Sequence, residues 1–242
     1  MSNISSAGPG APTPVGKPSP FKGPMKAGGF LILWMVVLFG GAGRMDWTRG
    51  WIFLGLYVAA MVVAGLAIHH FNPELMKARE QWRSKKDTKP FDRIFLAIYM
   101  PLTFIQPAIA GLDVRFGRTP MPAATIYWGA TLFVLGAVLI AWTLAVNRFA
   151  ETTVRIQTDR GHQVVSSGPY AVVRHPMYVG MVVMYGAGTL ILGSLWALVP
   201  TALMTVLLIV RTALEDRTLR RELAGYEDYT RQTPYRLLPG VW

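Results

Sequence analysis

The sequence predicts an all-α fold, a polytopic membrane bundle of about five or six transmembrane helices. Of its 242 residues, 52% are hydrophobic and only 15% are charged, which is too apolar for the surface of a soluble domain. The apolar residues gather in runs close to the roughly 20 residues that a helix needs to cross a bilayer. No stretch alternates apolar and polar residues as a half-buried strand does.

The chain is expected to have three parts: residues 1–25, residues 26–146 and residues 147–242. The first is rich in Pro, Gly and Ser and has no apolar run, so it lacks the core of a secretory signal. It is predicted to be a disordered cytoplasmic tail. The second part is predicted to hold the N-terminal transmembrane helices, and the third to carry the chemistry.

Two spans begin the membrane part, at residues 28–43 and 51–68, and form a helical hairpin. Residues 69–93 then turn strongly polar and basic. This segment is predicted to be a cytoplasmic loop that is partly helical, because Pro73 suits the first turn of a helix.

Two further spans are predicted at residues 94–112 and 124–146. The last apolar block, residues 177–210, is too long for one ordinary crossing and has Gly193 and Ser194 at its midpoint. It is therefore predicted to form a hairpin of two short helices, with a single tilted helix as the alternative.

The basic residues predict the orientation of these spans. With the N-terminus inside and six passes, most of the 24 lysines and arginines fall in the cytoplasmic segments. Both termini and the polar segment of residues 147–176 are therefore expected on the cytoplasmic side. A single final helix would place the C-terminal arginines outside, against this rule.

The inventory of residues disfavours several classes of site. The chain has no cysteine, so it has no disulfide, thiolate metal site or cysteine nucleophile. The four histidines lack the helical i, i+4 pairing of a metal site, so no metal is expected. The net charge of +11 is spread between apolar spans, which suits anionic headgroups better than nucleic acid. No glycine-rich strand-to-helix turn supports a Rossmann-type nucleotide site.

Two polar segments flank the last apolar block, residues 147–176 before it and residues 211–239 after it. A hairpin between them returns both to the same membrane face. They are therefore expected to lie against each other at the cytoplasmic surface and to form one site.

The side chains of these segments suit a small zwitterionic cation. His175 is a candidate to bind a carboxylate, and Glu215 a candidate to bind an ammonium group, through charge-assisted hydrogen bonds. Tyr170 and Tyr178 offer aromatic faces to a cation. Gln157 and the extended backbone that follows it offer donors and acceptors to the edge of a base.

Arg211 and Glu215 are four residues apart and share one helix face at the membrane margin. Taken alone, Arg211 has an equally good interpretation as a snorkelling anchor, and Glu215 as a solvated helix end. A lone His175 or Tyr170 is likewise typical of structural roles. Their joint placement favours a functional site.

The order of the motifs carries a resemblance to a known family. The motifs are Gly168-Pro169-Tyr170, then Arg174-His175-Pro176-Met177-Tyr178-Val179-Gly180, then the acidic pair Glu215-Asp216, then Tyr226 and Tyr229. As a composite, over about residues 145–239, they resemble the isoprenylcysteine carboxyl methyltransferase family and its phospholipid methyltransferase relatives.

The resemblance implies an integral membrane methyltransferase that uses S-adenosylmethionine and a lipophilic acceptor within the bilayer. By position it implies catalytic roles for Arg211 and Glu215, with Arg211 facing the substrate. The cofactor-binding residues that it implies are Gln157, His162, Gln163, Val164, Val165, Tyr170, His175, Pro176, Met177, Tyr178 and Glu215.

The nature of the acceptor decides what these residues must do. A carboxylate is already ionised near pH 7 and needs no base, and Arg211 is placed to hold it. Carboxyl O-methylation of an isoprenoid or lipid-linked acid is therefore the favoured activity. An amine acceptor, as in phospholipid N-methylation, would need Glu215 or Asp216 as a base. A sterol-reductase-like enzyme and a non-enzymatic membrane protein stay open as alternatives.

Overall fold

A computed structural model describes residues 22–119 and 121–242. It divides into two units, the first ending at Leu33 and the second comprising Trp34–Trp242. The described residues of the first unit are helical. The predicted disordered tail lies outside the described residues up to residue 21, and its last residues belong to the first helix.

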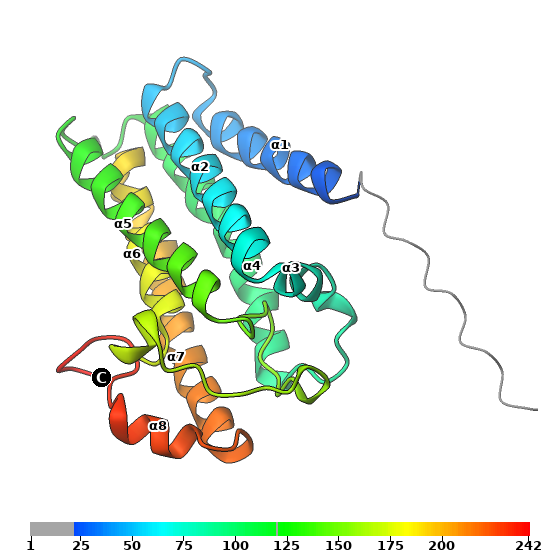
Figure 1. Cartoon of the computed structure of the whole chain (residues 1–242). Helices are drawn as coiled ribbons and strands as arrows, with labels where there is room; N and C mark the ends of the chain where they lie inside the picture. Colours follow the sequence, from blue (N-terminus) through cyan, green and yellow to red (C-terminus); the bar gives the residue numbers. More distant parts are fainter. Residues whose placement is uncertain (1–21, 120) are drawn as a thin grey trace, which may run out of the picture. The chain divides into compact units, whose positions relative to one another are not determined.

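The described residues form eight α-helices and three short 3-10 helices, and no β-strand is found among them (Figure 1). The α-helices are α1 (Lys22–Ala42), α2 (Thr48–Phe71), α3 (Pro73–Glu80), α4 (Pro90–Phe116), α5 (Thr125–Val146), α6 (Pro176–Leu192), α7 (Leu198–Glu222) and α8 (Tyr226–Gln232). The 3-10 helices are η1 (Trp82–Ser84), η2 (Thr158–Arg160) and η3 (Gly168–Ala171). The all-α prediction is confirmed.

Among the described residues, α2, α4, α5 and α7 are the helices long and apolar enough to cross a membrane. Helix α6 and residues 28–42 of α1 are apolar but shorter. The protein is therefore a multi-pass membrane protein, and the predicted count of six passes includes both shorter helices. The spans predicted at residues 51–68, 94–112 and 124–146 coincide with α2, α4 and α5.

Proline and glycine mark the ends of several helices. Pro73, Pro90 and Pro176 lie in the first turns of α3, α4 and α6, where proline lacks only an N–H that the helix does not use. Gly117 and Gly193 end α4 and α6 with φ of 61° and 74°, a left-handed conformation that glycine adopts without steric cost.

The last apolar block is a hairpin, as predicted, with its turn after Gly193. Arg49 stabilises this turn by donating to the carbonyl oxygens of Leu190 and Ile191, each at 3.2 Å. These are among the carbonyls that a helix end leaves without partners. Helix α7 is longer than the expected short helix, because it continues from the apolar block through charged residues to Glu222.

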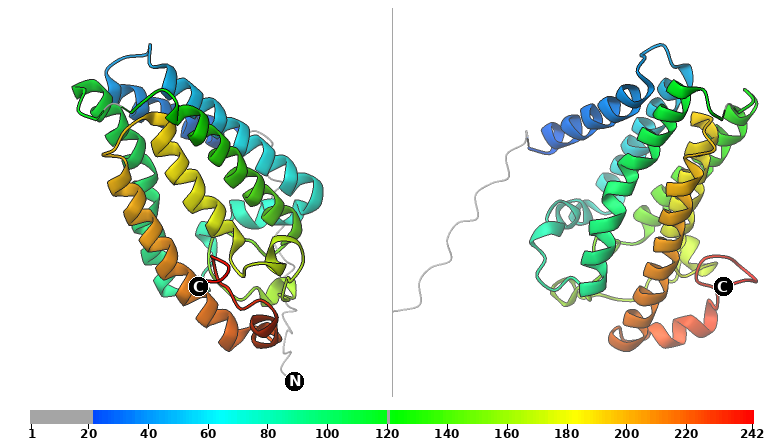
Figure 2. Two further views of the ribbon diagram at one scale, coloured as in Figure 1. Left: turned by 90° about the vertical axis from the view of Figure 1, so that its left-hand side faces the viewer. Right: turned by 180° about the vertical axis from the view of Figure 1, so that it is seen from behind.

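Helices α5 and α6 run antiparallel and pack most closely, as two views show (Figure 2). Gly136 and Gly180 face each other, and a Cβ added to either would lie 2.9 Å from the other's carbonyl oxygen. Gly129 meets the backbone of α6 in the same way, near Ala187 and Ile191. Small residues allow such close approach of helices in membranes, where packing rather than water drives association.

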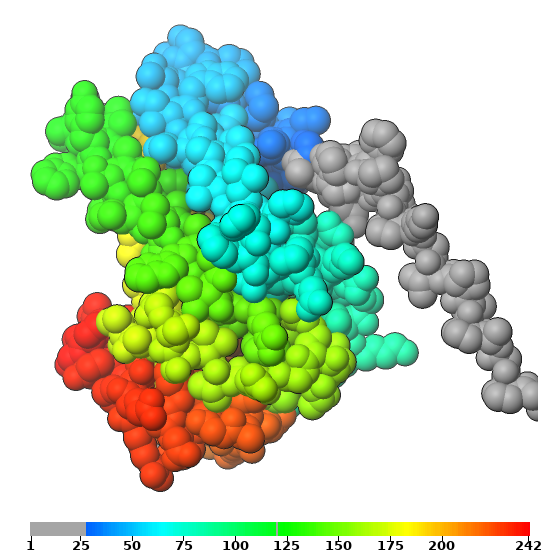
Figure 3. Space-filling model, viewed as in Figure 1, coloured from blue at the N-terminus to red at the C-terminus, as the bar shows by residue number. Residues whose placement is uncertain are grey.

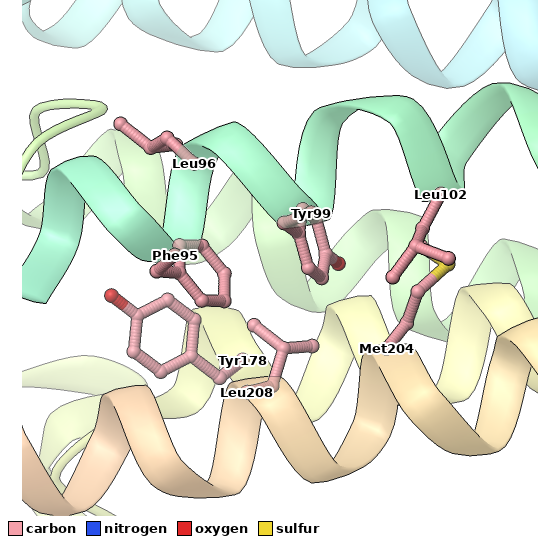
Figure 4. Close-up of a cluster of buried hydrophobic side chains, with 7 residues drawn as sticks. All are labelled: Phe95, Leu96, Tyr99, Leu102, Tyr178, Met204 and Leu208. Atoms are coloured by element: carbon pink, nitrogen blue, oxygen red, sulfur yellow. The ribbon is translucent and has the colours of Figure 1, made fainter.

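Helices α4 and α7 are held together by a buried cluster (Figure 4). Phe95 and Tyr99 of α4 stack with ring centroids 4.7 Å apart and pack near Leu208 of α7. Tyr178 from the start of α6 completes the cluster beside Phe95. The cluster therefore fixes three helices at the end of the bundle where the polar segments lie.

The polar segment between α5 and α6 packs against the C-terminal segment rather than extending into solvent. In Figure 3 its yellow-green surface lies between the cyan surface that includes α3 and the orange and red surface of α7 and α8. The expected meeting of the two polar segments is found.

Candidate functional site

A pocket opens where the loop between α5 and α6 meets α7 and α8. It contains about 770 Å³ of empty space, part of it open to the surroundings. Every predicted site residue except Pro176 lines it: Gln157, His162, Gln163, Val164, Val165, Tyr170, His175, Met177, Tyr178, Arg211 and Glu215. Pro176 instead begins α6 and sets His175 at the junction of loop and helix.

Glu215 and Tyr178 form the polar centre of the wall. The Tyr178 hydroxyl donates to Oε2 of Glu215 at 2.5 Å. The Tyr178 ring also lies nearly parallel to the His175 imidazole, at 6° with centroids 5.8 Å apart. A carboxylate and two ring faces therefore stand side by side in the pocket.

Asp216, the other member of the acidic pair, is fully buried and is not among the residues that line the pocket. Arg174 and Arg236 donate to its two carboxylate oxygens at 2.8 and 2.9 Å, and Tyr226 donates at 3.1 Å. His175 Nε2 lies 3.6 Å from it. Asp216 thus joins α7 to the loop, α8 and the C-terminus, and the structure does not place it as a base for an acceptor.

Arg211 is buried, with 6% of its side chain exposed, so it is not a snorkelling anchor. Its Nε lies 2.8 Å from Oδ1 of Asp92, and Nη2 donates to the carbonyl oxygen of Thr152 at 2.8 Å. The guanidinium also lies over the rings of Phe95 and Tyr178, at 4.5 and 5.3 Å from their centroids. It faces the bundle interior and the pocket.

Ion pairs hold the loop in shape. Arg155 donates to both oxygens of the fully buried Glu151, at 2.8 and 2.9 Å, and to Asp159 at 2.8 Å. The hydrogen bond to Glu151 raises the pKa of Arg155 despite the opposing effect of its burial. Glu151 and Arg155 both line the pocket, so their pairing shapes its wall.

Gln157 and His162 fold the loop back on itself. The Gln157 side chain donates to the carbonyl oxygen of Phe149 at 2.6 Å and accepts from Arg160 at 2.7 Å. The Gln157 N–H donates to Nδ1 of His162 at 3.3 Å. Burial lowers the pKa of His162, which favours the neutral ring that this bond requires. The Gln157 amide thus serves the loop itself.

Helix α8 closes the pocket through tyrosines. The Tyr229 hydroxyl donates to the carbonyl oxygen of Tyr170 at 2.7 Å, and Asn147 donates to the Tyr170 hydroxyl at 2.7 Å. Tyr226 and Tyr229 line the pocket as well, so the tyrosine pair is not an interfacial anchor.

Sequence reasoning missed several residues that line the pocket, and also Asp92, which pairs with Arg211 behind it. Asp92 lies in the first turn of α4, where an acidic residue is typical and gives no signal of a buried partner. The missed residues that line the pocket include Asn147, Phe149, Glu151, Thr153, Arg155 and Arg174. Two signals were present: Glu151 and Arg155 are four residues apart, and Arg174 lies within the motif around His175.

Comparison with known proteins bears on this pocket. Residues 124–224, from the start of α5 to the end of α7, match the family described as "Phospholipid methyltransferase". This part of the chain is similar to that family. The matched residues include every predicted site residue.

A second comparison gives a partial match. The chain is 35% identical over 91 residues to the Delta(14)-sterol reductase TM7SF2 of Mus musculus, a match that covers 36% of this chain and 22% of the reductase. The chain thus spans only a small part of that relative.

The residues of the pocket fit the methyl donor of such enzymes, S-adenosylmethionine. Glu215 offers an anion to its ammonium group, and the faces of Tyr170 and Tyr178 suit its sulfonium. Thr153 Oγ1 is buried and makes no hydrogen bond with the described residues. Buried polar atoms without partners are uncommon and indicate a missing partner.

Proposed function

We propose that this protein transfers a methyl group from S-adenosylmethionine to the carboxylate of a lipophilic acceptor, an isoprenoid or a lipid-linked acid. One observation carries the proposal: a buried arginine, Arg211, shares the pocket wall with Glu215 and Tyr178. A cation at the junction of pocket and bilayer suits an acceptor that is anionic at one end and apolar at the other.

The roles of the residues follow from their contacts. When bound, S-adenosylmethionine supplies a methyl group already activated by its sulfonium. Glu215, held by Tyr178, binds the ammonium group, and His175 binds the carboxylate. The tyrosine rings and residues 162–165 enclose the remainder of the molecule and exclude water.

Arg211 binds the acceptor carboxylate with the donors that Asp92 and Thr152 leave free. Because both partners fix its orientation, little side-chain entropy is lost when the acceptor binds. The acceptor is ionised near pH 7 and needs no general base.

Calorimetric titration with S-adenosylhomocysteine tests the cofactor site. Micromolar binding by the detergent-purified protein, lost in His175→Ala and Glu215→Ala, is the expected result. A folded wild-type protein that binds none of it would overturn the proposal and favour a non-enzymatic role.

Phospholipid N-methylation is a second candidate, favoured by the description of the matched family. Alkaline hydrolysis of lipids labelled with radioactive methyl groups separates the two. A methyl ester releases volatile methanol, whereas an N-methyl group stays on the headgroup and is not volatile.

A membrane reductase is a third candidate, favoured by the match to the mouse sterol reductase. Titration with a reduced nicotinamide nucleotide tests it. Saturable binding of that nucleotide, together with no binding of S-adenosylhomocysteine, would replace the methyltransferase proposal.

We also propose that the pocket opens to the cytoplasm. The basic loops that surround it, residues 69–93 and 147–176, support this orientation by the positive-inside rule.

A further inference from the structure

A second pocket lies between η1 and α4, outside the cofactor site. It contains about 1090 Å³ of space, much of it open. Its residues are Trp82, Arg83, Ser84, Lys85, Lys86, Thr88, Arg93, Leu96, Ala97, Met100, Pro101 and Thr153, called here the basic groove.

The basic groove has a cationic part and an apolar part. Its cations are Arg83, Lys85, Lys86 and Arg93, and Arg93 donates to the carbonyl oxygen of Lys86 at 2.7 Å. Arg83, Lys86 and Arg93 are exposed and form no ion pair with any described carboxylate, and Lys85 has only a distant one, 3.9 Å from Asp159. Unpaired cations close together attract an anion from solution or from the membrane surface.

The apolar part is a stripe on α4. Leu96, Ala97, Met100 and Pro101 follow Arg93 at helical spacing, so they share its face of the helix. Met100 lies within a membrane-spanning helix, and its side chain is 38% exposed, so a lipid chain is able to contact it. An apolar stripe that begins at a cationic cluster complements one kind of ligand, a lipid with an anionic headgroup.

Thr153 connects the basic groove to the cofactor pocket, because it lines both. It is 6% exposed, and its hydroxyl oxygen makes no hydrogen bond with the described residues. The backbone on either side is fixed, since Thr152 accepts from Arg211 and the Val154 N–H donates to Asp92 at 2.8 Å. An unpartnered hydroxyl thus lies in the wall between the two pockets, one residue from the contact of Arg211.

We propose that the basic groove is the entry site for the methyl acceptor, and that it selects a lipid with an anionic headgroup. The headgroup binds Arg83, Lys86 and Arg93 while the apolar chain lies along α4, and the headgroup then passes Thr153 to reach Arg211. This assignment rests on the proposed function, and it adds the route by which the anionic acceptor reaches Arg211.

Binding of a spin-labelled lipid tests the groove without measuring activity. The chain has no native cysteine, so Gln81→Cys, beside Trp82, accepts a single fluorophore. The labelled full-length protein is reconstituted in phosphatidylcholine vesicles at alkaline pH. Stearic acid with a nitroxide near its carboxyl end, or the methyl ester of the same acid, is added as the quencher. The two probes differ only in the charge of the headgroup.

The acid is expected to quench the fluorophore at a concentration about tenfold lower than the ester at low salt, since each cation near the surface contributes to the attraction. The double substitution Arg83→Gln and Lys86→Gln should remove this preference. Lys77→Gln with Arg217→Gln, which removes two exposed cations outside the groove, should retain it. Equal quenching by acid and ester, or an equal loss in both double variants, would overturn the proposal.

Thr153→Val supplies a second measurement. Since valine has nearly the same shape, quenching by the acid should be unchanged, while methyl transfer to anionic lipid should fall several-fold. Unchanged transfer would remove Thr153 from the path. S-adenosylhomocysteine binding, measured on the same samples, separates the outcomes: if it persists while the acid shows no preference, only the groove assignment fails. If it is absent in the wild type, the proposed function fails.

Discussion

Asp92 of α4 and Arg211 of α7 form a buried ion pair, with Oδ1 and Nε 2.8 Å apart. Asp92 also accepts the Val154 N–H, and Arg211 also donates to Thr152. The pair therefore joins two membrane helices to the loop that forms the pocket. It couples the stability of the bundle to the shape of the site.

Asp92→Asn is expected to destabilise the protein by about 3–5 kcal/mol, because it leaves the Arg211 charge buried without a counter-ion. Asp92→Asn combined with Arg211→Met should recover most of this loss, since neither charge then remains. Thermal unfolding in detergent measures both. The folded double variant should bind S-adenosylhomocysteine but fail to methylate an anionic acceptor. A double variant as unstable as the single one would refute the coupling.

Glu215→Gln is expected to weaken S-adenosylhomocysteine binding by roughly tenfold to a hundredfold, since it removes the charge from a charge-assisted hydrogen bond. Glu227→Gln is the matched control, because Glu227 is exposed on α8 and does not line the pocket. Calorimetry measures both affinities. Equal affinities in the two variants would remove Glu215 from the cofactor site.

Cofactor binding is expected to weaken in acid because of His162. Burial lowers its pKa below the ordinary value of 6.5. Above pH of about 6.5 the ring is neutral in both the folded and the unfolded protein, so affinity stays constant there. Below about pH 6.5, His162 takes up a proton more readily in the unfolded loop than in the folded loop. The folded loop therefore becomes less stable as the pH falls.

A titration with S-adenosylhomocysteine between about pH 5 and 8 measures this decline. His162→Asn is the test variant, because the amide oxygen is able to accept the Gln157 N–H at every pH in this range. The decline should be smaller in this variant. The same decline in both proteins would assign it to another group.

Gly136→Ala is expected to cost about 1–3 kcal/mol, because the new Cβ would lie 2.9 Å from the Gly180 carbonyl oxygen. Gly55→Ala in α2 is the control, since its Cβ would meet nothing within 4 Å. That change should be neutral or stabilising, as alanine favours a helix. The unfolding temperatures of the two variants measure the difference. Similar values would contradict the close packing of α5 and α6.

The proposed orientation predicts the labelling of single cysteines. Lys77→Cys in α3 and Ala123→Cys before α5 lie at opposite ends of the bundle, and both positions are exposed. In sealed vesicles with the cytoplasmic face outward, a membrane-impermeant thiol reagent should label the first and spare the second. The reverse pattern would invert the topology.

The amino-acid sequence was sufficient to predict the membrane bundle and many of the residues that line the pocket. Apolar runs of membrane length identify the spans, and Gly193 at the midpoint of the last block places the hairpin turn. The sequence also predicts that His175, Tyr178 and Glu215 lie close together. They flank the predicted hairpin, and the two ends of a hairpin lie at the same side of the bundle.

The pairing of these residues depends on how the helices pack. Arg211 meets Asp92, and Asp216 meets Arg174 and Arg236, because helices far apart in the sequence pack side by side. Sequence spacing reports neighbours on one helix, whereas a buried charge must find its counter-ion wherever the fold supplies one. The basic groove likewise exists only because η1 folds against α4 beside Thr153.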